Sequence, residues 1–482
     1  MVKTLIVGTG FGGLCLAAKL REQGDDDFII IEKADSVGGT WRENTYPGAE
    51  CDIPSALYSY SFEPNPTWDF KWAKQPQILK YIQDFAVSRD LMKHIEFDQT
   101  VISAEYDEGR WNVKTQSGQM YDCQFFISAI GQLHVPSLPT IKGRDKFKGH
   151  SFHSSRWNHS VELKGKNIGV IGVGASAAQL IPEIAKKAKR LTVYQRSPNW
   201  IINKGDRPYT QFEKWIANYI PSITKLYRKG LWMQGEYVIW PIIKGAKIRS
   251  KLARKASQSE MKKYIKDAEL QTKLTPDYPI GAKRILFSDS YYPAIARKNV
   301  TLETDEIIEI QKDGIRTSAA TIHRHDIIIY ATGFYSNPFL KEIDVIGKTG
   351  QKLSERWKDG AYAYLGVTTA NFPNMFMLYG PNTNTGHTSI IYKLEAQVEH
   401  ILKLMKRTVQ GSIEVKADIE ADFNRDAQER LSQLAWAKID ASWYKDGDRV
   451  TNNWPGSSSE FKRRLENPIW EHFDIRHHIS DE

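Results

Sequence analysis

Two glycine-rich loops are the residues of this sequence whose types and spacing most clearly predict chemistry. The first reads G-x-G-x-x-G and contains Gly8, Gly10 and Gly13. The second reads G-x-G-x-x-A and begins with Gly172 and Gly174. In such a loop the first glycine allows a tight turn, the second lets backbone approach a pyrophosphate, and the third position lets helix and strand pack closely. Each loop therefore predicts a dinucleotide phosphate at the start of a helix.

The residues around the first loop predict a strand, a helix and a second strand. We expect the strands at 4–7 and 28–31 and the helix at 14–20. Glu32 follows the second strand, where a carboxylate accepts hydrogen bonds from a ribose. A second glycine pair, Gly38 and Gly39, comes soon afterwards, which is typical of proteins that bind FAD. The first loop is therefore interpreted as part of an FAD site.

The same series of elements starts again around the second loop. Strands are expected at 167–171 and 191–194, with a helix from 178 to about 187 between them. Where an NAD site has an acid, this sequence has Gln195, Arg196 and Ser197. The planar guanidinium of an arginine suits a 2′-phosphate, so we predict a preference for NADP over NAD. Two such folds in one chain, the first for FAD and the second for NADPH, suggest a flavin oxidoreductase that carries out its own reduction step.

Length and composition are those of an ordinary globular protein. The 482 residues are enough for two or three domains, and 41% of them are hydrophobic and 26% charged. We find no apolar run of about eighteen residues that could cross a bilayer. The N-terminus does not resemble a secretion signal, so a cytoplasmic location is expected. Three cysteines, Cys15, Cys51 and Cys123, lack C-x-x-C spacing and disfavour a disulfide scaffold or a metal site.

A distinctive string lies between the two glycine loops. It reads F-x-G-x-x-x-H-x-x-x-W and contains Phe147, Gly149, His153 and Trp157. This string, placed just ahead of the second loop, resembles the fingerprint of Baeyer–Villiger monooxygenases, which belong to the class B flavoprotein monooxygenases. The series G-G-T-W, Y-P-G, C-D, Y and S-F over residues 38–62 is similar to that family as well. The resemblance covers nearly the whole chain.

The resemblance implies a site assembled from distant segments, with Arg284 and Asp52 as its catalytic pair. His153 and Trp157 are expected to couple the domains rather than to touch substrate. For FAD, the expected contacts are Gly8, Gly10, Gly13, Glu32, Gly39, Thr40, Trp41, Asp52, Tyr58, Val101 and Ile390. For NADP, they are Gly172, Gly174, Ser176, Gln179, Arg196, Ser197, Lys283 and Trp443.

The same resemblance implies a reaction. NADPH would reduce FAD, the reduced flavin would trap O2 as a C4a-peroxide, and this species would convert a ketone to an ester or lactone and would also oxidise sulfides. Arginine suits an anionic peroxide because it keeps its proton when buried. Two alternatives stay open, an N- or S-oxygenating flavin monooxygenase and an NADPH-dependent flavin reductase. The absence of a paired cysteine motif disfavours a disulfide reductase.

The predicted fold class is α/β, with two Rossmann-like dinucleotide-binding domains. Residues 1–140 and 331–482 are expected to form the FAD domain, 141–162 a linker with the fingerprint, and 163–330 the NADP domain. A helical insertion is expected at 206–276, with apolar residues at helical spacing.

Positive charge is concentrated within this insertion. Residues 225–266 hold twelve Lys and Arg against two acids. We interpret this segment as a solvated face; contact with a membrane surface is the less favoured alternative, and nucleic acid is not expected. The substrate is expected to be a small lipophilic ketone or sulfide, used together with O2, but pocket residues follow no motif that identifies it.

Overall fold

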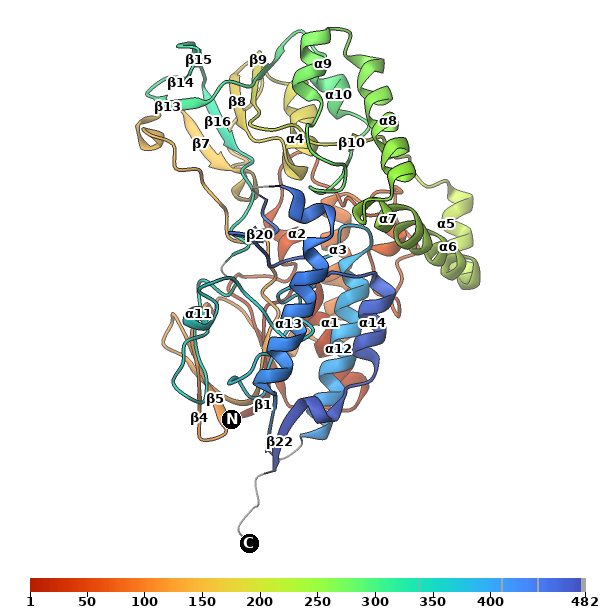
Figure 1. Cartoon of the computed structure of the whole chain (residues 1–482), viewed down its shortest axis with the longest axis vertical. Helices are drawn as coiled ribbons and strands as arrows, with labels where there is room; N and C mark the ends of the chain where they lie inside the picture. The colour runs from red at the N-terminus through yellow and green to blue at the C-terminus, as the bar shows by residue number, and fades with distance from the viewer. Residues whose placement is uncertain (338, 409–410, 440–441, 478–482) are drawn as a thin grey trace.

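The computed structural model describes residues 1–337, 339–408, 411–439 and 442–477, which form two lobes, each built on a sheet (Figure 1). The lower lobe in that view holds the larger sheet and the long helices α1 (Phe11–Glu22), α12 (Ile390–Arg407), α13 (Ala417–Ser432) and α14 (Ser458–Glu466). The upper lobe holds the smaller, parallel sheet and α4 (Ala175–Ala185). The predicted α/β fold class is confirmed.

The larger sheet has eight strands and is mixed. Strand β1 lies at its centre and pairs in parallel with both β2 and β6, as a dinucleotide-binding unit requires. Buried side chains of β1, α1 and α12, among them Ile6, Leu14 and Ile401, share one core on a face of this sheet. In spatial order the strands are β17 (Asp344–Ile346), β4 (Val101–Asp107), β5 (Arg110–Thr115), β6 (Met120–Ser128), β1 (Val2–Val7), β2 (Phe28–Ile31) and β3 (Ile95–Glu96), with β18 (Met375–Met377) beside β6.

The second sheet consists of five parallel strands. Their order is β12 (Val300–Glu303), β9 (Arg190–Tyr194), β8 (Asn167–Ile171), β16 (Ile327–Tyr330) and β7 (His150–His153). Residues 150–153, which were expected within a linker, thus form the outermost strand, because their backbone pairs with β16 from Ile327 to Tyr330. A small antiparallel sheet of β13 (Ile307–Gln311), β14 (Gly314–Thr317) and β15 (Ile322–Arg324) is attached to this lobe.

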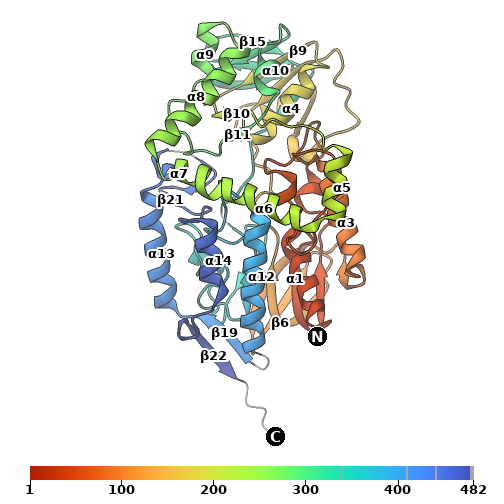
Figure 2. The same cartoon turned by 90° about the vertical axis from the view of Figure 1, so that its right-hand side faces the viewer.

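A run of helices occupies residues 211–274, within the segment expected to be a helical insertion. Figure 2 shows α6 crossing the flank of the molecule where the two lobes meet. Thr210 and Glu213 form a capping box that starts α5, and Pro221 stands in the first turn of α6, where its missing N–H costs nothing. The helices are α5 (Gln211–Tyr219), α6 (Pro221–Gln234), a π-helical turn (Gly235–Ile239), α7 (Trp240–Ile243), α8 (Lys247–Tyr264) and α9 (Ala268–Leu274).

The remaining elements are short or lie at the edges of the lobes. They are α2 (Thr40–Glu43), α3 (Gln75–Ser88), α10 (Tyr291–Ile295), α11 (Leu353–Arg356), β10 (Ile201–Ile202), β11 (Leu286–Phe287), β19 (Gly411–Val415), β20 (Lys445–Asp446), β21 (Arg449–Val450) and β22 (Phe473–His477), with 3-10 turns at Ser55–Leu57, Met92–His94, Arg144–Lys146, Ser154–Arg156, Ala435–Lys438 and Trp470–His472.

Candidate active site

The first glycine loop joins β1 to α1 with the geometry of a phosphate-binding turn. Gly8 has a φ of +108°, and a Cβ on Gly13 would lie 2.0 Å from the Gly8 carbonyl oxygen, so a side chain at Gly13 would collide with the strand. Gly10 begins the helix, and no side chain caps it. A Cβ on Gly10 would meet nothing within 4 Å. Uncapped amides beside open space are what a pyrophosphate needs.

Glu32 lies at the end of β2 beside this loop, and its carboxylate is buried and firmly held. Oε2 accepts hydrogen bonds from the Thr9 amide at 3.0 Å and from the Thr9 hydroxyl at 2.6 Å. Oε1 pairs with Arg42 at 3.2 Å. The amide of Gln99 donates to the Glu32 carbonyl at 2.9 Å, and two residues later Val101 opens β4. The structure therefore places Glu32 and Val101 near each other, beside the first loop.

The expected flavin contacts after Glu32 gather around α2. Gly39 has a φ of +51° and precedes Thr40, the first residue of α2. The indole nitrogen of Trp41 donates to the Tyr58 hydroxyl at 3.0 Å, and the two rings meet edge to face. Burial raises the pKa of Tyr58 well above its ordinary value, so its hydroxyl stays protonated. Ile390 is more distant in sequence and starts α12, whose first turn is capped by the Ser389 hydroxyl.

The second glycine loop, in the other lobe, has the same phosphate-binding geometry as the first. Gly172 has a φ of +111°, and Gly174 begins α4 with no side-chain cap and nothing within 4 Å of a Cβ. Ser176 lies in the first turn of that helix. Gln179, an expected NADP contact, lies one turn further on. Its side-chain amide bonds to the Tyr46 hydroxyl at 2.8 Å and to both backbone groups of Glu50, so it joins the two lobes.

The residues expected to hold a 2′-phosphate come together at the end of β9. The Lys283 ammonium donates to the Ser197 hydroxyl at 2.8 Å, although the two residues are far apart in sequence. Burial and the nearby charge of Arg196 lower the pKa of Lys283. Arg196 itself is exposed. The charges of Lys283 and Arg196 repel each other, and a bound dianion would relieve that repulsion.

Asp52 and Arg284 meet across the two lobes. The Arg284 Nε donates to Asp52 Oδ2 at 2.5 Å, and its Nη1 lies 3.4 Å from the Thr385 carbonyl oxygen. Burial alone would lower the pKa of Arg284, but the Asp52 carboxylate overrides this effect and holds the pKa above its ordinary value. Arg284 is therefore a permanent cation with a fixed direction, placed between the Asp52 loop and the loop before α12.

A narrow pocket adjoins this ion pair. Its walls include residues that the sequence analysis did not single out, because they follow no motif. Tyr444 is fully buried there, and burial raises its pKa to about 12. Trp443, an expected NADP contact, packs against Tyr444 with ring centroids 4.4 Å apart. The pocket is lined by Ile243, Gly281, Lys283, Arg284, Ile285, Gly386, Trp436 and Tyr444.

The fingerprint residues lie in and around β7. A Cβ on Gly149 would lie 2.3 Å from the Asp326 carbonyl oxygen, so only glycine fits there. His153 is buried, its Nδ1 is bonded to Ser155, and its ring packs edge to face on Phe334, in the segment that leads back to the first lobe. Phe147 and Trp157 pack against separate cores of the second lobe. None of these four residues lines the pocket beside Arg284.

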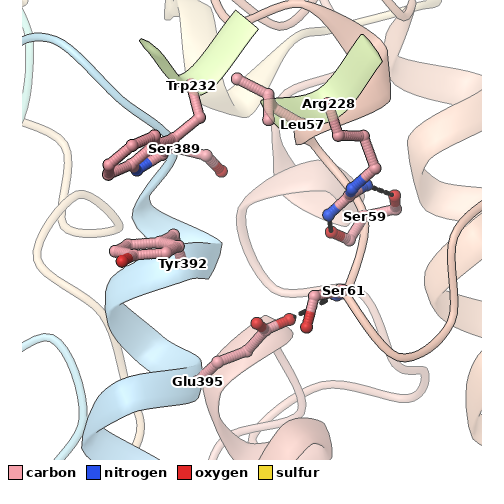
Figure 3. Close-up of a pocket in the computed structure, with 8 residues that line it drawn as sticks. All are labelled: Leu57, Ser59, Ser61, Arg228, Trp232, Ser389, Tyr392 and Glu395. Carbon is pink, nitrogen blue, oxygen red and sulfur yellow. Dashed lines mark hydrogen bonds between the residues drawn. The ribbon is translucent and has the colours of Figure 1, made fainter. Parts of the chain in front are cut away.

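A second pocket lies between α6, the start of α12 and residues 57–61 (Figure 3). Trp232 and Tyr392 form one wall, opposite Arg228 and Ser59. Arg228 donates to the Ser59 hydroxyl at 2.8 Å and to the Ser59 carbonyl at 3.1 Å, which fastens α6 to the first lobe. The pocket is lined by Leu57, Ser59, Ser61, Arg228, Trp232, Ser389, Tyr392 and Glu395.

The three cysteines are not arranged for redox chemistry. Cys15, Cys51 and Cys123 are buried and free, and burial raises the pKa of each thiol. Inert, separated thiols do not form a redox pair. Among the described residues, no group of three or more His, Cys, Asp or Glu is arranged to hold a metal ion. Within the same residues, no helix is long and apolar enough to cross a membrane.

Comparison with known proteins agrees with this geometry. A model of the flavin-binding monooxygenase-like family matches residues 2–221. A Baeyer–Villiger monooxygenase from Pseudomonas aeruginosa is 39% identical over 468 residues, covering 95% of this chain and 89% of the relative. The crystal structure of OTEMO complexed with FAD and NADP has a TM-score of 0.89 at 30% identity and covers 98% of this chain and 99% of that one. The closed structure of cyclohexanone monooxygenase has a TM-score of 0.88 at 27% identity, with 99% of both chains covered. The chain therefore belongs to the Baeyer–Villiger monooxygenase family.

Proposed function

We propose that this protein is an FAD- and NADPH-dependent monooxygenase that inserts one oxygen atom beside the carbonyl of a lipophilic ketone. The balanced reaction consumes the ketone, NADPH, a proton and O2, and yields an ester or lactone, NADP⁺ and water. Membership of the family supports the reaction class. The observation that carries the proposal is the Arg284–Asp52 ion pair, with its 2.5 Å contact between the lobes.

The two glycine loops fit the two cofactors. The uncapped helix starts at Gly10 and Gly174 each offer free amides beside open space, which suits a pyrophosphate. Glu32 would hold the FAD ribose from the end of β2, and Arg196, Ser197 and Lys283 would hold the NADP 2′-phosphate. When bound, the two cofactors supply the hydride transfer and the activation of O2.

Arg284 would supply the fixed positive charge that the oxygen transfer requires. Charge develops on oxygen when an oxygen nucleophile adds to a carbonyl, and a preorganised cation stabilises it without reorganising at the moment of reaction. Asp52 would act as a positioning residue, because its carboxylate binds the Nε edge of the guanidinium and leaves the other edge toward the Thr385 loop. The aromatic wall of Trp436 and Tyr444 would exclude water from that side.

The remaining site residues would orient the cofactors. Trp41 and Tyr58 brace each other through their hydrogen bond, and we propose that they hold the flavin end of FAD. Trp443 would cover the nicotinamide from its place against Tyr444. His153 and Trp157 would couple the lobes from β7. The apolar pocket walls favour a lipophilic ketone, and a sulfide of similar shape would fit the same walls.

The test compares Arg284→Ala and Arg284→Lys with wild type, using FAD, NADPH and a panel of ketones and sulfides. We expect Arg284→Ala to retain FAD but to form ester about 10²–10³ times more slowly. Arg284→Lys should form ester little faster than Arg284→Ala, because a lysine cannot present the fork of donors that Asp52 and Thr385 bind. Arg207→Ala removes an exposed, ion-paired arginine and serves as the matched control.

Two results would contradict the proposal. One is an Arg284→Ala enzyme that forms ester at the wild-type rate. The other is a wild-type enzyme that consumes NADPH and O2 and gives hydrogen peroxide but no oxygenated product with any ketone or sulfide. Sulfoxide or N-oxide without any ester would instead favour the N- or S-oxygenating alternative.

A further inference from the structure

Exposed apolar side chains are concentrated on the helices between the two lobes. Of the twenty-one large hydrophobic side chains that are exposed among the described residues, eleven lie between residues 212 and 252. Leu226 is 70% exposed and Ile248 is 77% exposed. Single exposed apolar residues are normal on any protein, but a concentration of this kind marks an interaction surface.

These side chains form continuous rows rather than scattered points. Phe212, Trp215 and Tyr219 are spaced three and four apart on α5, so they share one face of the helix. Their rings contact each other in sequence, with centroids 6.2 Å and 5.6 Å apart. Ile223 and Leu226 continue the row on α6, and Figure 2 shows α5 and α6 following each other across the same flank.

The same flank is strongly positive. Eleven of the twelve Lys and Arg between residues 225 and 266 are exposed, and Arg228 is the exception. None of these eleven cations forms an ion pair with another described residue. One of the two acids, Glu236, is buried and faces inward, where it bonds to His387 at 2.9 Å and to the Ser458 amide. Only Glu260 is left to offset the positive charge.

We infer that helices α5 to α8 dock this enzyme on an anionic lipid bilayer. Aromatic and aliphatic side chains would enter the boundary between headgroups and acyl chains, and the surrounding lysines would bind the anionic headgroups. Long lysine side chains can do both, because their stems are apolar and their ends are charged. A second copy of the chain would bring like charges together, and nucleic acid would gain nothing from exposed isoleucine and leucine.

Docking would place a pocket wall next to the bilayer. The face of α6 that points inward carries Arg228 and Trp232, which line the pocket of Figure 3, while Leu226 and Met233 on the same helix are exposed. Ser389 in that pocket and Gly386 beside Arg284 belong to one loop. A ketone dissolved in lipid would therefore enter the protein at α6. This link to substrate entry rests on the proposed function, whereas docking itself does not.

The experiment is co-sedimentation of the FAD-loaded enzyme with vesicles of phosphatidylcholine, with and without one quarter phosphatidylglycerol. Three variants are compared, each a triple substitution at exposed positions. The basic variant is Lys247→Gln, Lys251→Gln and Lys255→Gln, and the apolar variant is Trp215→Ser, Leu226→Ser and Ile248→Ser. The control, Lys164→Gln, Lys187→Gln and Lys189→Gln, makes the same charge change at exposed positions just before β8 and just after α4, outside helices α5 to α8.

We expect wild type to bind the anionic vesicles and to dissociate from them as salt rises from 0.1 to 0.5 M. The basic variant should bind about 100-fold more weakly and the control should bind like wild type. The apolar variant should also lose binding, since it removes the inserted side chains. Turnover of a water-soluble ketone should be equal in all four proteins, which separates failed docking from a failed enzyme.

Three results would overturn the inference. Wild type could stay in solution with both vesicles, the basic variant and its control could lose binding equally, or light scattering could show a stable dimer that the apolar variant dissociates. The last result would mean that a second copy of the chain covers this face.

Discussion

Replacing Asp52 by asparagine tests the ion pair on which the proposed chemistry depends. The substitution keeps the size of the side chain and removes its charge, and both partners are only about one quarter exposed, at 26% for Asp52 and 22% for Arg284. Opposite charges with centres about 4 Å apart attract by about 4 kcal/mol at an effective dielectric constant near 20. Because asparagine keeps one hydrogen bond to Arg284, we expect the free energy of unfolding to fall by less than this, about 2–3 kcal/mol.

Two measurements follow from this magnitude. The melting temperature of the FAD-loaded enzyme should fall by about 3 °C, given an unfolding entropy of about 1 kcal/mol/K for a chain of this length. Ester formation should fall about 100-fold, because Arg284 loses the partner that directs it. Asp69→Asn is the matched control, since it breaks a pair with Lys214 at the same 2.5 Å but at an exposed position, and such pairs contribute about 0–1 kcal/mol. Equal melting temperatures and equal rates of ester formation in Asp52→Asn and Asp69→Asn would show that the Asp52–Arg284 pair contributes no more than an exposed ion pair.

Three further predictions concern other parts of the molecule. Lys283→Ala should raise KM for NADPH about 10–100-fold and leave KM for NADH nearly unchanged. An equal rise in KM for NADPH and for NADH would contradict a 2′-phosphate site. Lys393 is fully buried, and among the described residues its ammonium makes one weak hydrogen bond, to the Asn384 carbonyl at 3.4 Å; burial lowers its pKa well below the ordinary value. The unfolded chain binds the proton of the Lys393 ammonium more tightly than the native state does, so Lys393→Met should raise the melting temperature at pH 7. The difference from wild type should shrink as pH approaches 10, and a difference that stays constant with pH would contradict the prediction. Burial lowers the pKa of His153 to about 4, so the native state should lose stability as pH falls from about 6.5 toward 4, and melting curves of His153→Asn should show a shallower pH dependence than wild type.

The glycine loops could be predicted from the sequence because their requirements are local. Gly8 and Gly172 need a positive φ, and Gly13 has no room for a side chain, so residue type and spacing alone mark both turns. The four strands that flank them, β1, β2, β8 and β9, begin and end close to the predicted positions, because a buried parallel strand is a short apolar run. The α/β fold class followed from these units.

The partners of several residues could not be predicted, because tertiary packing decides them. Gln179 lies on the helix of the second loop, yet its amide joins the lobes at Tyr46 and Glu50. Tyr444 reaches the Arg284 pocket from the position after Trp443, and no motif marks it as a residue of the pocket wall. The spacing of Phe212, Trp215 and Tyr219 predicted an apolar helix face, but spacing does not specify what covers that face, and in the structure all three are exposed.

The most direct test of the central claim is to run the reaction under ¹⁸O2 with NADPH and a lipophilic ketone, and to analyse the product by mass spectrometry. We expect an ester or lactone that carries one ¹⁸O atom, formed in proportion to NADPH consumed by wild type and lost in Arg284→Ala. An unlabelled product, or NADPH oxidation that yields only labelled hydrogen peroxide, would contradict it.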